Sequence, residues 1–497
     1  MRSGGRGWWA AIVLALAPHA ADAPAAEPPA ERLNVLFVSV DDLRPELGSY
    51  GAPTVTPRID RLAAEGLRFN RAYASAAACA ASRVSMVTGV YPHTTRVYLM
   101  KPPLAQANPA LVTMPQLFRE AGYEAVEIGK FMHVDEDAPN AWSRERWMPA
   151  WDPPEYLVPE NRHMTGIRKV PRGPVGEGAD VADGDYLDGK LARRAVQELR
   201  RLHDRPFFLA VGFVRPHLPF NCPKRYWDLY DPAEIAVPEA PDAEAVPPLE
   251  WHGNYEPAFY SDGGMIDSAT GARMIHGYRA CVSYIDAQVG LILDELDRLA
   301  LADRTVVVLW GDHGWHLGEH GIWGKNTAFE VALRVPLILR VPGFPAGHAS
   351  QALVESVDIL PTLCELVGIP IPEQVQGRSF EPLLRSPDRP WKQAAFGWRQ
   401  RPVRAGQTVR TPRYRFVRWI TRDGFATTVH ATELYDHDSD PGETVNLADD
   451  PRRVQTVRRM HALIDAWLRL KPTGLLGGDA DPNARAPDRT SVAYSSR

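Results

Sequence analysis

The stretch LNVLFVSVDD, residues 33–42, joins a mostly apolar run to two consecutive acids. Three other stretches have the same design: YEAVEIGKFMH (123–133), PFFLAVGFVRPH (206–217) and RTVVVLWGDHGWH (304–316). Short runs rich in Val, Ile, Leu and Phe are typical of strands that are buried on both faces of a parallel sheet. The four stretches therefore predict four such strands, each followed by polar residues.

Helical patterns lie between these strands. Apolar residues recur at helical spacing in TVTPRIDRLAAEG (54–66), DGKLARRAVQELRRLH (188–203) and ACVSYIDAQVGLILDELDRLAL (280–301). The alternation of strands and helices predicts an α/β sandwich with a large, mostly parallel central sheet flanked by helices.

Ligands of open α/β sheets bind beyond the carboxyl ends of the strands. A solvated loop is the alternative explanation for any one polar cluster, but four clusters at the same predicted edge indicate a site. The residues that follow the four strands are Asp41, Asp42, Lys130, His133, His217, Asp312 and His313.

Three of these residues are acids that would repel one another at a common edge. A divalent cation removes that repulsion and suits the hard oxygen ligands of Asp41, Asp42 and Asp312. His313 would be a fourth ligand, and its softer nitrogen keeps magnesium and manganese open beside calcium.

A cysteine stands in the run ASAAACAASRVSMVTGVYPHTTR, residues 74–96. Free cysteine is often a buried structural residue, which is the simpler interpretation of Cys79. If the segment is helical, however, Cys79 and Arg83 lie one turn apart on one face, near the positive end of a helix. That arrangement favours an anionic nucleophile and an anionic substrate.

Composition and charge restrict the class of protein. Of the 497 residues, 45% are hydrophobic and 24% are charged, which is typical of a globular protein. A net charge of −5 argues against a nucleic-acid partner. With only four cysteines, one of them a candidate nucleophile, the framework is not built on disulfides.

The first residues have the layout of a secretory signal peptide. Arg2 and Arg6 precede the apolar run at residues 8–17, and small residues follow it. We assign residues 1–26 to this signal and expect a protein exported to the periplasm or the extracellular space. The run is too short for a stable membrane span.

The chain resembles the type I sulfatases of the alkaline phosphatase superfamily, in the branch that contains iduronate-2-sulfatase. The family signature, cysteine–any–proline or alanine–serine–arginine followed by threonine–glycine, is matched by Cys79, Ala81, Ser82, Arg83, Thr88 and Gly89. Ala81 replaces the more common proline. The resemblance extends over nearly the whole chain and includes VSVDDLRPELGSYG, GKFMH, WGDHGWHLGEHGIWGK and ELYDHDSDPGETVNLA.

In that family the cysteine is oxidised after translation to formylglycine (3-oxoalanine). The resemblance therefore implies this modification at Cys79 and a formylglycine-generating enzyme as a partner. An oxygen of the hydrated aldehyde attacks the sulfur of a sulfate ester, and sulfate is later expelled to regenerate the aldehyde.

The resemblance also implies roles for the other residues. Arg83, Lys130 and Lys325 would neutralise the sulfate oxygens. His217 or Lys325 would supply or stabilise the proton that the leaving alcohol needs. His133 would act as a base. The metal ligands would be Asp41, Asp42, Asp312, His313 and an oxygen of modified Cys79, with Ca²⁺ the first choice and Mg²⁺ or Mn²⁺ as alternatives.

The residues after Gly377 have a different character, with short strand patterns followed by one helical pattern at residues 451–470. We predict a catalytic domain over residues 27–376, a smaller antiparallel subdomain over 377–472, and a disordered tail over 473–497 that is rich in Gly, Asp, Pro and Arg.

Three functions fit this sequence. The first is an exported sulfatase that acts on sulfated sugars, for which a 2-O-sulfated uronate is the expected substrate. The second is a phosphoester or phosphonate monoester hydrolase on the same scaffold. The third is a non-catalytic glycan-binding relative, which would keep Cys79 unmodified.

Overall fold

The computed structural model describes residues 1, 32–149, 155–165, 171–239, 247, 249–251, 253–264, 266–423 and 426–470. The predicted signal peptide, apart from Met1, and the predicted tail over 473–497 lie outside these residues. The boundaries of the predicted domains stay predictions.

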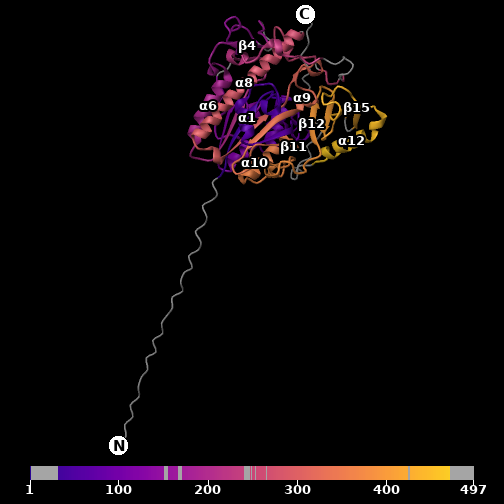
Figure 1. The fold of residues 1–497 in the computed structure, drawn as a ribbon. Helices are drawn as coiled ribbons and strands as arrows, with labels where there is room; N and C mark the ends of the chain where they lie inside the picture. Colours follow the sequence, from indigo (N-terminus) through magenta and orange to yellow (C-terminus); the bar gives the residue numbers. More distant parts are fainter. Residues whose placement is uncertain are drawn as a thin grey trace. The chain divides into compact units, whose positions relative to one another are not determined.

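A seven-stranded sheet forms the centre of the molecule (Figure 1). The four predicted strands are neighbours within it and run parallel, in the order β7, β1, β5, β3. Only β10 runs antiparallel to its neighbours, β7 and β2. The full order is β11 (His348–Glu355), β2 (Leu67–Tyr73), β10 (Arg334–Arg340), β7 (Thr305–Gly311), β1 (Asn34–Val40), β5 (Phe207–Phe213) and β3 (Glu124–Gly129).

Both faces of the central strands are covered. Every residue of β1, β5 and β7 is buried. Along β1, Leu36 and Val38 belong to one hydrophobic core, whereas Val35 and Phe37 belong to the other. This alternation explains why the strand is almost continuously apolar, because neither of its faces meets water.

Different helices cover the two faces of the sheet. The first core includes buried residues of α1 (Pro57–Ala64), α6 (Leu187–Leu202) and α8 (Ser268–Arg298), and Figure 1 shows α6 and α8 side by side. The second core includes residues of α2 (Cys79–Thr88), α5 (Met114–Glu120), α10 (Ile359–Val367) and α11 (Glu381–Arg385).

Helix α8 begins twelve residues before the pattern that predicts it, which starts at Ala280. The added turns carry Met274 and Tyr278, both buried, and Asp267 caps the first turn by accepting a hydrogen bond from the Thr270 amide at 2.8 Å. The remaining short elements are α3 (Pro92–Thr95), α4 (Leu104–Ala107), α7 (Lys224–Trp227), α9 (Glu330–Leu333), β4 (Gly176–Ala179), β6 (Phe220–Pro223), β8 (His316–Leu317) and β9 (Trp323–Gly324).

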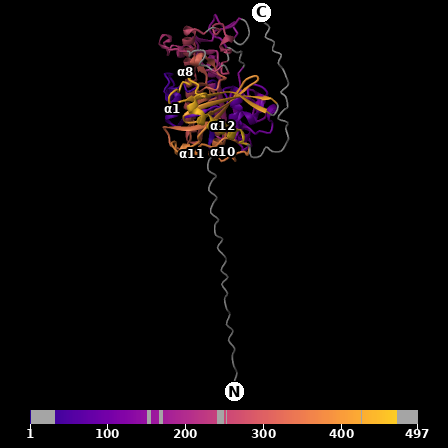
Figure 2. The same ribbon diagram turned by 90° about the vertical axis from the view of Figure 1, so that its right-hand side faces the viewer.

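The C-terminal part forms an antiparallel sheet of four strands, as predicted. Met460, Ile464 and Trp467 of α12 (Val454–Leu468) pack on this sheet, beside which Figure 2 shows the helix in yellow. The strands follow one another as β12 (Ala395–Gln400), β13 (Ala405–Arg410), β14 (Tyr414–Asp423) and β15 (Ala426–Asp436).

Two further expectations concern cysteines and membranes. Cys79, Cys222, Cys281 and Cys364 are all free and buried, in agreement with a framework that disulfides do not build. Among the described helices, none combines the length and the apolar character that a bilayer span requires.

Candidate active site

The carboxyl ends of four adjacent strands bring the predicted polar residues to one edge of the sheet. The ladder continues past the strand ends, because the Asp41 amide donates to Phe213 O at 3.2 Å and the Asp312 amide donates to Val40 O at 3.3 Å. Asp41, Asp42, Asp312 and His313 are fully buried there.

A left-handed backbone turns the second of the two consecutive acids toward the site. Successive side chains of a strand point to opposite faces, so Asp41 and Asp42 could not share a site in extended conformation. Asp42 has a φ of 60°, which is rare for a residue with a side chain. Its Oδ1 lies 3.5 Å from Nε2 of His313, and its amide donates to Asp312 Oδ1 at 3.0 Å.

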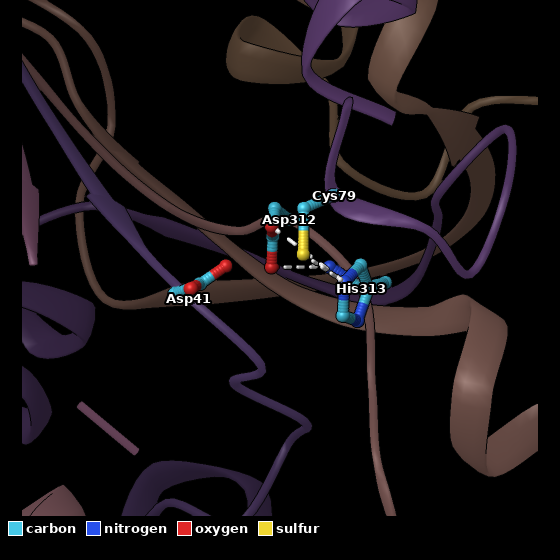
Figure 3. A group of neighbouring side chains, drawn as sticks. All are labelled: Asp41, Cys79, Asp312 and His313. Carbon is cyan, nitrogen blue, oxygen red and sulfur yellow. Dashed lines mark hydrogen bonds and ion pairs between the residues drawn. The ribbon is translucent and has the colours of Figure 1, made fainter. Parts of the chain in front are cut away.

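Cys79 is the first residue of α2, as the helical interpretation of this segment requires. All ten residues of the helix are buried, which explains its run of alanines and serines. The Cys79 Sγ lies 3.2 Å from Nε2 of His313, and Figure 3 shows the thiol pointing toward His313 and Asp312. The positive end of the helix macrodipole is therefore directed at the site.

Arg83 lies one turn after Cys79 and is fully buried. Its guanidinium donates to Asp312 Oδ2 at 3.0 Å, to Asp41 Oδ1 at 3.2 Å and to Phe131 O at 2.9 Å. Burial opposes its charge, but Asp312 and Asp41 raise the pKa of Arg83 above its ordinary value. Arg83 thus stays cationic and holds two of the acids in place.

Two lysines add further positive charge. Lys325 Nζ donates to both carboxylate oxygens of Asp42, at 2.8 and 3.1 Å, and lies 3.6 Å from the Cys79 Sγ. Lys130 Nζ donates to Asp41 Oδ2. The chain turns into Lys130 at Gly129, which has a φ of 73° and packs so closely on β5 that a Cβ would lie 2.2 Å from Gly212 O.

The two predicted histidines differ in their contacts. A nitrogen of His217 lies within 4.8 Å of carboxylate oxygens of Asp41 and Asp42. The His217 Nδ1–H donates to Leu218 O at 2.7 Å. The other ring nitrogen, Nε2, lies 3.7 Å from Glu256 Oε1. His133 is partly buried, and burial together with the Lys130 charge lowers its pKa to about 3, so that it is neutral at neutral pH.

Glu256 belongs to the site but was not predicted. Its Oε1 lies 3.2 Å from Lys325 Nζ and 3.7 Å from His217 Nε2, and its Oε2 accepts a hydrogen bond from the Trp315 indole at 3.5 Å. It lies in an irregular segment between the third and fourth predicted strands, where neither periodicity nor a motif marks it.

The donor set fits a divalent cation. Ligand atoms of Asp41, Cys79, Asp312 and His313 all lie within 4.8 Å of one another. The His313 Nδ1–H donates to Gly314 O at 2.9 Å, which orients the ring so that Nε2 faces the acids. Although burial opposes protonation, the negative potential of the cluster, with Asp312 the main contributor, raises the pKa of His313 to about 10. The same potential would attract a cation.

A second cluster of possible ligands has a different character. Glu330, His437 and Glu443 also lie within 4.8 Å of one another. However, Arg415 forms ion pairs with Glu330 at 2.5 Å and with Glu443 at 2.6 Å, and Arg410 pairs with Glu330 at 3.0 Å, so two arginines already balance the two acids. The cluster joins the four-stranded sheet to α9 and is structural.

Comparisons with known proteins show the family to which the chain belongs. The family model described as Sulfatase matches residues 33–369, and the model described as N-sulphoglucosamine sulphohydrolase, C-terminal, matches residues 318–469. Iduronate 2-sulfatase of Homo sapiens is 33% identical, over 84% of this chain and 92% of the relative.

Solved structures with low sequence identity share the fold. The phosphonate monoester hydrolase of Agrobacterium radiobacter has a TM-score of 0.75 at 24% identity, covering 88% of this chain and 95% of its own. A 2-O GAG sulfatase has a TM-score of 0.67 at 24% identity, covering 88% and 92%. The family model spans more than half of the chain and the human relative most of it, so this chain belongs to the sulfatase family and is a sulfuric ester hydrolase.

Proposed function

We propose that this sulfatase hydrolyses sulfate esters of sulfated sugars, and that a 2-O-sulfated uronate is the substrate to test first. The observation that carries the proposal is the position of Cys79, whose Sγ lies 3.2 Å from His313 Nε2 and 3.6 Å from Lys325 Nζ. A nucleophile at this position would stand between a metal centre and a cationic pocket.

The substrate sulfate is proposed to bind against Arg83, Lys130 and Lys325. These groups neutralise the oxygens on which charge grows in the transition state, and buried, preoriented cations do so without the cost of reordering water. Arg83 is held by Asp41 and Asp312, so its donors are fixed before substrate arrives.

A divalent cation and the modification of Cys79 would complete the proposed chemistry. A divalent cation, with Ca²⁺ first and Mg²⁺ or Mn²⁺ as alternatives, would be held by Asp41, Asp42, Asp312 and His313 and would supply positive charge beside the sulfate. Oxidation of Cys79 to formylglycine, by a maturation enzyme, would supply an oxygen nucleophile at the start of α2.

The leaving alcohol needs a proton or a positive charge. We propose that His217 or Lys325 donates this proton or supplies this charge, because both lie close to Glu256 on one side of the pocket. His133 is proposed to accept a proton later in the cycle, because its low pKa keeps the ring neutral at neutral pH, with one nitrogen able to accept.

The substrate class rests on what the relatives are named for. The human relative is an iduronate 2-sulfatase and one structural neighbour is a 2-O GAG sulfatase. Export through residues 1–26 would place the enzyme where sulfated polysaccharides occur.

A phosphonate monoester hydrolase is the second candidate, because a protein of that name shares the fold at a TM-score of 0.75. Lys130 and Lys325 favour a sulfate ester, since they bind Asp41 and Asp42 on the side where a phosphatase would hold a second metal. A non-catalytic glycan-binding relative is the third.

One experiment separates the three candidates. The protein is coexpressed with a formylglycine-generating enzyme. Release of the phenol is measured from matched aryl sulfate, phosphate and phosphonate esters, and release of sulfate is measured from a set of sulfated disaccharides. We expect sulfate release that Cys79→Ala abolishes. Faster cleavage of the phosphate or phosphonate ester would establish the second candidate, and an unmodified Cys79 together with no release would establish the third.

A further inference from the structure

We propose that a surface cavity beside strand β11 binds a sulfated polysaccharide at a second site, separate from the active site. The nature of the ligand follows from the proposed function, but the site itself is argued from its own residues. The cavity has a volume of about 500 Å³. It is lined by the middle of β11 (Gln351–Leu353), residues 387–393, Pro412 and Arg459 of α12.

The cavity lies at a different place in the fold from the catalytic residues. Strand β11 is the edge strand of the central sheet, and three other strands, β2, β10 and β7, separate it from β1. The catalytic candidates follow the ends of β1, β3, β5 and β7 or, as Cys79, Arg83 and Lys325, lie outside them, and none of them lines the cavity, which is formed in part by the middle of β11. A ligand in this cavity would therefore leave the active site open.

Trp391 lines the cavity and holds two arginines, of which Arg389 lines the cavity and Arg378 lies beside it. The guanidinium of Arg378 lies 4.0 Å from the centroid of the Trp391 ring, and that of Arg389 lies 5.9 Å from it. Stacking on an aromatic ring holds a guanidinium while its N–H donors at the edge remain free to bind an anion. Two exposed arginines are thus oriented by one side chain.

These arginines lack acidic partners within the described part of the chain. Arg378, Arg389 and Arg459 are exposed, and none forms an ion pair there. Lys392 also lines the cavity, but its Nζ is bound to Glu355 at 2.8 Å and to Asp358 at 2.6 Å. Among the described residues that line the cavity Asp388 is the single acid, whereas Arg389 and Arg459 line it as well and Arg378 lies beside it on the Trp391 ring, so these arginines leave a local excess of positive charge.

The chemistry of the ligand follows from this charge and shape. Guanidinium groups bind sulfate and carboxylate groups through paired hydrogen bonds. Two arginines in the lining and a third beside it suit a polymer that carries anions at intervals better than they suit one isolated ion. A polysaccharide that is both the ligand here and the substrate at the strand ends would, once bound in the cavity, be present at a higher effective concentration at the active site.

The test compares a triple variant, Arg378→Gln, Arg389→Gln and Arg459→Gln, with a control of equal charge, Arg119→Gln, Arg205→Gln and Arg298→Gln. The control arginines are exposed, and none of them lines the cavity. Binding is measured by the salt concentration that elutes each protein from immobilised heparin, a readout that needs no turnover. Thermal unfolding of each variant checks that the fold is kept.

We expect the cavity variant to elute at lower salt than both the wild type and the control. If the enzyme is active on heparin, its KM for the polymer should rise by about tenfold, with kcat/KM for a sulfated disaccharide unchanged. Equal elution of the cavity variant and the control would overturn the proposal, as would competition by unsulfated hyaluronate equal to that by heparin. Neither result depends on whether the proposed reaction occurs.

Discussion

The carboxylate of Glu256 lies 3.2 Å from the ammonium of Lys325, which also binds Asp42. The same oxygen lies 3.7 Å from His217 Nε2. One side chain thus fixes the two groups that are proposed to serve the leaving alcohol.

Replacement of this carboxylate tests that relationship. We expect Glu256→Gln to lower kcat by about 10- to 100-fold with a smaller change in KM, because misplaced catalytic groups lose mainly transition-state stabilisation. Steady-state kinetics with an aryl sulfate measures the effect, and Glu160→Gln, an exposed carboxyl, is the control. A change confined to KM would show that Glu256 only contacts the substrate.

The acids at the strand ends are expected to make the enzyme depend on a divalent cation. Treatment with a chelator should abolish turnover and lower the unfolding temperature, and addition of Ca²⁺ should restore both. At 100 times its Kd, a bound ion stabilises the fold by about 2.7 kcal/mol. Calorimetric scans with and without the ion measure this, and Asp312→Asn should respond much less. A thermal transition that is insensitive to chelator in the active wild type would contradict the metal site.

The buried Arg415 network is expected to contribute strongly to stability. Arg415 is 1% exposed, and its removal as Arg415→Met leaves Glu330 and Glu443 without a major partner. Breaking such a buried pair should lower the free energy of unfolding by about 3–5 kcal/mol. Urea denaturation measures this against Arg205→Met, whose ion pair with Asp204 is 54% exposed on both sides and should contribute much less. Equal losses would contradict the structural role.

The buried Asp286 should make stability depend on pH. It accepts hydrogen bonds from the amides of Arg58 at 3.0 Å and Ile59 at 2.7 Å, and burial raises its pKa from 3.8 to about 7. Its native protonated form therefore contributes stability that is fully present below about pH 4 and is lost as the pH rises through about 7.

The variant Asp286→Asn keeps the oxygen acceptor but cannot ionise. We expect its free energy of unfolding to rise relative to that of the wild type between pH 4 and pH 8, measured by urea denaturation at a series of pH values. A difference between the two proteins that is constant over this range would show that Asp286 does not titrate there.

Much of the fold could be predicted because strand burial leaves a strong pattern. The apolar runs around Val35–Val40 and Val306–Trp310 could only be buried on both faces, and parallel strands bring their polar ends together. Neighbouring strands with weaker patterns were not predicted. β2 carries Arg68, Asn70 and Arg71 among its apolar residues, and β10 is interrupted by Pro336, so neither has a continuous apolar signal.

The site could be predicted where residues follow strand ends or lie within a motif, and not elsewhere. The left-handed φ of Asp42 depends on tertiary packing, because the bond from its amide to Asp312 joins positions 270 residues apart. Glu256 reaches Lys325 and His217 from an irregular segment. Such long-range pairings have no local signature in the sequence.

The most direct test is mass spectrometry of the Cys79 peptide, made on enzyme whose specific sulfatase activity has been measured. Preparations with different extents of maturation are compared, with Cys79→Ala as the inactive control. We expect activity to rise in proportion to the fraction of peptide that carries the aldehyde. Full activity in a preparation whose Cys79 is an intact thiol would contradict the proposed nucleophile.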